Sequence, residues 1–86
     1  MIEFAFRGTI ADIDETIPGE PSHPTIVLIL EVGDTFSRVI VPEAVLNAGR
    51  ELLCVARPVH LFGEVRDSRW GPRHIATELR LLGSPH

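Results

Sequence analysis

The sequence predicts an all-β fold of five strands with one short helix between the third and the fourth strand. Apolar and polar residues alternate along several segments, which is typical of strands that bury one face. Prolines and glycines separate these segments, as residues of turns do. The segment after Pro42 has its apolar residues at helical spacing instead, which predicts the helix.

Length and composition fit one domain. The 86 residues are 44% hydrophobic and 23% charged, as expected of a small globular chain. We assign residues 1–82 to this domain and residues 83–86 to a C-terminal tail. The sequence has neither a leader pattern nor an apolar run of bilayer length, so we expect a cytoplasmic protein that does not use a membrane.

Residue types with chemical reactivity are sparse. The single cysteine excludes a disulfide within the chain, and the four histidines lack the spacing of a zinc site. Cys54 follows two leucines, so we expect a small buried side chain rather than a nucleophile. No triad, carboxylate pair or glycine-rich phosphate loop is evident. We therefore expect a protein that is not an enzyme and uses no cofactor and no metal.

The first strand is expected over residues 2–13. Alternation there directs one set of side chains toward the core: Ile2, Phe4, Phe6, Gly8 and Ile10. Gly8 suggests a bulge or a bend, which lets a strand curl around a small barrel. Residues 14–24 hold three prolines, one glycine and three acidic residues, and we expect a loop there.

Residues 25–32 and 35–41 are expected to form a hairpin. Glycine in the first position of the turn Gly33–Asp34 suits type II′. Counting back from this turn pairs Val32 with Thr35 and Ile26 with Val41. One face then carries Ile26, Leu28, Leu30, Val39 and Val41. The opposite face carries Val27, Ile29, Glu31, Phe36, Arg38 and Ile40. We expect another segment of the chain or a partner to cover its aliphatic residues.

The second half of the chain continues with a helix and two strands. The helix is expected from Glu43 to Leu53, with a stripe of Val45, Leu46, Gly49 and Leu52 or Leu53. A strand over residues 59–66 would direct Val59, Leu61, Gly63 and Val65 inward and His60, Phe62, Glu64 and Arg66 outward. Residues 67–72 are expected to form a turn and residues 74–82 a fifth strand. There, Ile75, Thr77, Leu79 and Leu81 are expected opposite His74, Glu78 and Arg80.

Three strands, a short helix and two further strands follow the order of the OB-fold, a five-stranded Greek-key barrel. Three segments carry the resemblance: Phe6–Ile10 (FRGTI), Pro58–Val65 (PVHLFGEV) and Gly71–Leu82 (GPRHIATELRLL). They are similar to segments of small nucleic-acid-binding OB domains, including single-stranded-DNA-binding and replication-protein types. The resemblance covers almost the whole chain and implies the same barrel here.

In that family the ligand usually crosses the outer face of the second and third strands, between the loops that join strands one to two and four to five. The resemblance therefore implies a nucleic-acid site formed by Phe36, Arg38, Arg66, Arg69, Trp70 and Arg73. Arginines would contact phosphates, and the two aromatic rings would stack on bases. The first loop departs from the family pattern, because the acidic Asp14, Glu15 and Glu20 would repel a phosphate backbone.

Two functions follow as alternatives. The first is non-enzymatic binding of single-stranded DNA or RNA with low sequence specificity. It is favoured by the charge of residues 35–86, where seven arginines oppose five acids. The second is a protein-interaction or homo-oligomerisation module in which the aliphatic face of Val27, Ile29 and Ile40 packs on another chain. The net charge of −4 favours this second function, and the fold alone does not choose between them.

Overall fold

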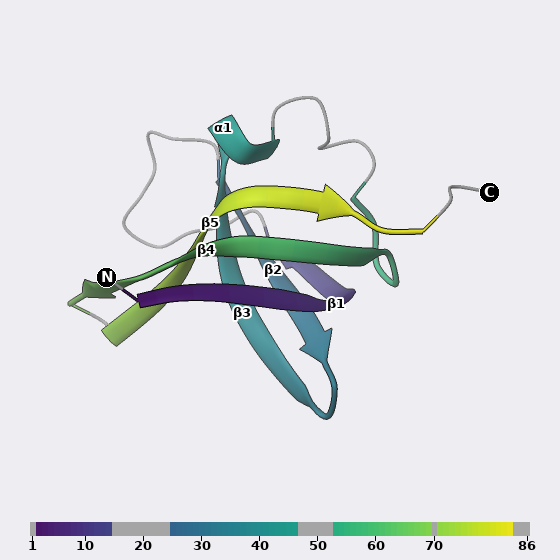
Figure 1. Cartoon of the computed structure of the whole chain (residues 1–86), viewed down its shortest axis with the longest axis horizontal. Coiled ribbons are helices and arrows are strands. Elements are labelled where there is room, and N and C mark those ends of the chain that lie inside the picture. Colours follow the sequence, from purple (N-terminus) through teal and green to yellow (C-terminus); the bar gives the residue numbers. More distant parts are fainter. Residues whose placement is uncertain (1, 15–24, 47–52, 70, 84–86) are drawn as a thin grey trace.

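Five strands and one short helix make up the computed structural model, which describes residues 2–14, 25–46, 53–69 and 71–83. In chain order the elements are β1 (Ile2–Asp14), β2 (Thr25–Val32), β3 (Thr35–Pro42), α1 (Glu43–Leu46), β4 (Pro58–Ser68) and β5 (Gly71–Leu81). The strands close into a barrel in the order β1-β2-β3-β5-β4 (Figure 1). Neighbouring strands are antiparallel except β3 and β5, which are parallel. This is the OB-fold, as predicted. No described helix has the length and apolar character that crossing a membrane requires.

Strand β1 is shared between two neighbours, and this closes the barrel. Residues 2–9 pair with β4, and residues 9–14 pair with β2. A Cβ atom at Gly8 would overlap the carbonyl oxygen of Glu31 on β2. The absent side chain therefore lets β2 approach β1 near the point where β1 changes its partner from β4 to β2. A bulge or a bend was predicted at Gly8, but the register of β1 shifts further along, between Ile10 and Asp12.

The β2–β3 hairpin has the predicted register over its whole length, from Val32 opposite Thr35 to Thr25 opposite Pro42. Gly33 has a φ of 61°. Asp34 is not among the residues with positive φ, which agrees with a type II′ turn and not with type I′. In Figure 1 the turn of this hairpin projects away from β4 and β5.

The core fills the inside of the barrel. All five residues predicted on the apolar face of the hairpin are buried there. The other buried members of the core cluster come from the rest of the chain: Ile10, Leu46, Leu53, Val59, Leu61 and Ala76. Val45 and Leu46 of α1 turn toward the core as expected, and α1 lies at one end of the barrel (Figure 1).

The segment after α1 differs from its prediction at two residues. Leu53 is buried as expected, yet it lies outside a helix; Gly49 and Leu52 lie outside the described residues. Cys54 is exposed, so the prediction of a buried thiol is wrong. The reason is a turn in which Ala56 takes a φ of 75° and donates its N–H to the carbonyl of Ile10 at 2.7 Å. This places Cys54 outside the barrel.

The β4–β5 hairpin is longer than predicted. Pairing continues to Ser68 opposite Gly71, so the expected six-residue turn over 67–72 is wrong and residues 69–70 alone connect the strands. The Ser68 hydroxyl donates to the carbonyl of Gly71 at 2.7 Å, and Gly71 has a φ of 102°. The hydrogen bond gives the Gly71 carbonyl a partner, and the absence of a side chain at Gly71 permits its positive φ.

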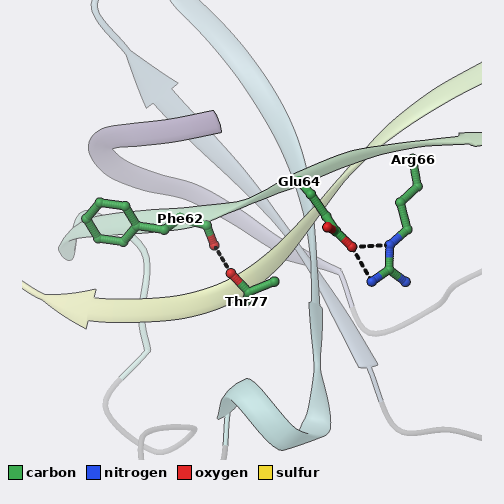
Figure 2. Close-up of polar contacts among 4 residues, drawn as sticks. All are labelled: Phe62, Glu64, Arg66 and Thr77. Carbon is green, nitrogen blue, oxygen red and sulfur yellow. Dashed lines mark hydrogen bonds and ion pairs between the residues drawn. The ribbon is translucent and has the colours of Figure 1, made fainter. Parts of the chain in front are cut away.

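A bulge in this hairpin reverses the predicted faces of the first half of β5. The register shifts between Phe62 and Gly63, so that Phe62 pairs with Glu78 while Gly63 pairs with Ala76. Thr77 is the extra residue: it is exposed, and its hydroxyl donates to the carbonyl of Phe62 at 3.3 Å (Figure 2). Ala76 is buried instead. The inward placement of Ile75 and Thr77 was therefore wrong, because alternation does not continue through a bulge.

Candidate nucleic-acid interface

Three of the predicted arginines lie on one outer surface of the barrel. Arg66 on β4 is directly opposite Arg73 on β5. Ile40 on β3 pairs with Ile75 on β5 in parallel, and Arg38 and Arg73 each precede these residues by two positions. Since residues two apart on a strand share a face, Arg38 and Arg73 lie on the same outer face. We call Arg38, Arg66 and Arg73 the arginine surface.

Glu64 pairs with one member of this surface. The Nε and Nη2 atoms of Arg66 both contact Oε1 of Glu64 two residues earlier on β4 (Figure 2). The Glu64 side chain is 16% exposed and that of Arg66 is 60% exposed. The carboxylate is thus largely covered, while the guanidinium still meets solvent. The ion pair lowers the charge that Arg66 offers to a phosphate.

Phe36 extends the arginine surface toward the tip of the β2–β3 hairpin. It lies two residues before Arg38 on β3 and is 66% exposed. Its partner across the hairpin is Glu31, which is also exposed. An exposed ring next to a guanidinium can stack on a base and place the neighbouring phosphate near the cation.

The remaining predicted site residues lie in the β4–β5 connection. Arg69 is exposed there, and Asp67 in the preceding strand is exposed as well. Trp70 lies outside the described residues, so its stacking role stays a prediction. Arg69 follows Arg66 by three residues in the sequence and lies just beyond the same end of β4.

The aliphatic face of the hairpin is smaller than expected. Ile29 and Ile40 are half-buried, but Val27 is 3% exposed although it lies outside the core cluster. Val27 is flanked by paired strands on both sides, opposite Asp14 on β1 and Ile40 on β3. The prediction that Val27 contributes exposed surface is wrong, and Ile29 and Ile40 keep the accessible part of this face.

Two features of the site were missed from the sequence. Glu64 and Arg66 were both placed outward on the same strand, so their spacing of two residues could have predicted the ion pair. The outward position of Ile75, beside Ile40, follows from the bulge at Phe62 and Gly63, for which the glycine was the available signal. Within the described part of the chain, no three His, Cys, Asp or Glu side chains gather to hold a metal ion.

Comparison with known proteins supports the architecture. No protein-family model matches the chain, and no curated protein matches it either. Among solved structures, the chain is similar to a chain in the crystal structure of the S. pombe Stn1-ten1 complex, with a TM-score of 0.73 and 20% sequence identity. The match covers 99% of this chain and 61% of the other, so this chain spans about three fifths of its neighbour. At this identity the likeness shows the fold, which is that of an OB domain.

Proposed function

We propose that this OB-fold domain binds single-stranded nucleic acid through the arginine surface and Phe36, without catalysis and with low sequence specificity. The observation that carries the proposal is that Arg66 and Arg73 lie directly opposite each other on β4 and β5. Arg38 lies on the outer face of the neighbouring strand β3, two residues from the exposed ring of Phe36. Guanidinium groups bind phosphates, and an exposed ring stacks on any base. Arg69 and Trp70 would extend this site at the β4–β5 connection.

Acidic neighbours limit the strength of such binding. Glu64 pairs with Arg66, Glu3 lies opposite Glu64 on β1, and Glu31 lies opposite Phe36. Each carboxylate lowers the positive potential of the surface at short range. Since salt screens phosphate contacts further, we expect the affinity to be measurable at low ionic strength and to fall steeply as salt is added.

The test is a titration of labelled oligothymidylate and oligouridylate over a range of salt concentrations. We expect binding whose logarithm falls linearly with the logarithm of salt concentration, by about 0.7 per phosphate contact. Arg38→Gln should reduce this slope by about 0.7, whereas Arg38→Lys, which keeps the charge, should largely preserve it. Absence of binding at low salt, or binding that is indifferent to salt, rejects the proposal. Comparing the two oligomers decides between DNA and RNA.

One set of observations favours a second function, an interaction with another protein or with a second copy of this chain. Ile29 and Ile40 stay partly accessible on the hairpin that also exposes Phe36. The structurally similar chain comes from a complex that contains Stn1 and ten1. Light scattering separates the two functions, because an apolar interface persists at high salt. A stable dimer that Ile29→Glu disrupts would support the second function, and a monomer under the same conditions would oppose self-association.

A further inference from the structure

A second group of basic side chains lies on the outer face of β1, β4 and β5, apart from the arginine surface. Arg7 on β1 is directly opposite His60 on β4, and His60 is directly opposite Arg80 on β5. The adjacent row, Phe6, Leu61 and Leu79, packs in or against the core. Because alternate residues of a strand point to opposite faces, the side chains of Arg7, His60 and Arg80 point outward together. We call them the Arg7–Arg80 row.

Phe62 holds two members of this row in place. Its ring centroid lies 4.1 Å from that of His60, with the planes tilted by 31°. The Arg80 guanidinium carbon lies 5.2 Å from the same centroid, within the range of a cation–π contact. A guanidinium that rests on a ring has already lost part of its conformational freedom, so less is lost when it binds an anion.

Charges around the row leave it cationic. Glu78 contacts Arg80 at 3.3 Å, with the two side chains 50% and 63% exposed, and such an exposed pair is readily exchanged for another anion. Arg7 is exposed and has no hydrogen bond or ion pair with any residue in the described ranges. Among the described residues Glu78 makes an ion pair with this row, and exposed Glu31 lies opposite Thr9, two residues from Arg7. The row thus presents two guanidinium groups in a chain whose net charge is −4.

We propose that the Arg7–Arg80 row is a second binding site for the phosphodiester groups of a single-stranded polynucleotide. The two arginines are two strand spacings apart, about 10 Å at the backbone, and long side chains can reach one phosphate or two neighbouring phosphates from there. The polynucleotide as ligand rests on the proposed function. The row itself is defined by register and ring contacts that do not involve the arginine surface.

The two sites lie at opposite ends of the same β4–β5 face. His60 and Arg66 are six residues apart on β4, which is about 20 Å along a strand. A stacked strand with one phosphate per about 3.4 Å needs about six nucleotides to cover this length. An oligomer of about 15 nucleotides can therefore contact both sites, whereas one of about four can occupy only one of them at a time.

The experiment is a titration of the isotope-labelled protein with oligothymidylate of about 15 nucleotides, followed by NMR. We expect chemical-shift changes at Arg7, His60 and Arg80 as well as at Phe36 and Arg38. Changes confined to Phe36 and Arg38 would overturn this inference and leave the proposed function intact. Changes confined to the Arg7–Arg80 row would support the inference and reject the arginine surface. No change at either site would overturn both.

A variant and a second polyanion make the assignment sharper. The double variant Arg7→Gln, Arg80→Gln removes two expected phosphate contacts of about 0.7 each. It should therefore reduce the slope of log affinity against log salt concentration for the longer oligomer by about 1.4. Glu78→Gln is the matched control, because it alters the same face without removing a cation and should not reduce the slope. Polyglutamate of similar length tests for an acidic protein instead. A response of the row to polyglutamate equal to that for oligothymidylate would overturn the assignment to phosphodiesters.

Discussion

Replacing Glu64 with glutamine is expected to strengthen the proposed nucleic-acid binding. The carboxylate of Glu64 is 16% exposed and contacts Arg66 through two nitrogen atoms. Glutamine keeps the shape of the side chain and removes its charge, so Arg66 becomes free to pair with a phosphate. One additional phosphate contact steepens the slope of the logarithm of the affinity against the logarithm of the salt concentration by about 0.7. Over a tenfold change in salt concentration this corresponds to about a fivefold difference in affinity.

The assay is fluorescence anisotropy with a labelled oligomer at about 20 mM and about 200 mM salt, chosen to span this tenfold range. The gain in affinity of Glu64→Gln over the unaltered protein should be about fivefold larger at the lower concentration. Glu43→Gln is the matched control, because it removes the same charge from an exposed position in α1. It should change the affinity equally little at both salt concentrations.

Stability should change little in the same variant. Arg66 is 60% exposed, so solvent screens the ion pair, and its contribution to the free energy of unfolding is at most about 1 kcal/mol. An affinity gain in Glu64→Gln that matches the Glu43→Gln control at every salt concentration would refute the reasoning. Arg66 would then not contact the phosphate backbone, and the arginine surface would lose one of its three members.

Three further substitutions separate binding from folding. Phe36→Ala should weaken binding of the oligomer by about 1–3 kcal/mol through lost stacking. Its unfolding transition should stay unchanged because the ring is 66% exposed. Unaltered affinity would exclude a stacking role. Gly63→Ala should lower the thermal unfolding midpoint by at least about 4 °C, since a Cβ there would overlap the carbonyl of Ile75 and overpacking costs about 1–3 kcal/mol. A midpoint equal to that of the unaltered protein would contradict the close approach. Leu28→Ala should cost about 2–5 kcal/mol in chemical denaturation, because Leu28 is fully buried, and a cost below about 1 kcal/mol would argue against a packed core.

The sequence predicts those parts of the fold that depend on local pattern. The β2–β3 hairpin was predicted in its register because a two-residue turn at Gly33 determines every pair that follows. The inward residues of β4, among them Val59 and Leu61, followed from strict alternation. The position of Cys54 was not predictable in this way, because it depends on how the turn at Ala56 bonds to Ile10 on β1. That contact joins residues far apart in the sequence.

The face of β5 that carries Arg73 was not predictable from alternation, and the bulge on β5 is the reason. Unbroken alternation from Leu79 back along β5 would turn Arg73 inward and His74 outward. With Thr77 as the extra residue, His74 instead lies inside, its ring centroid 5.0 Å from Phe4 and 5.1 Å from Phe6. Arg73 is thereby directed to the outer face opposite Arg66.

The arginine surface therefore depends on a single extra residue in β5. This dependence can be checked without any ligand, because the bulge brings the His74 ring against Phe4 while unbroken alternation would separate them. Nuclear Overhauser effects between these two rings should be present in the unaltered protein and absent after deletion of Thr77. If the deletion variant folds, it should also lose the salt-dependent contact proposed for Arg73, because Arg73 would no longer be on the outer face opposite Arg66. Ring contacts that persist after the deletion would show that the bulge does not set the faces of β5, and the alignment of the three arginines would need another cause.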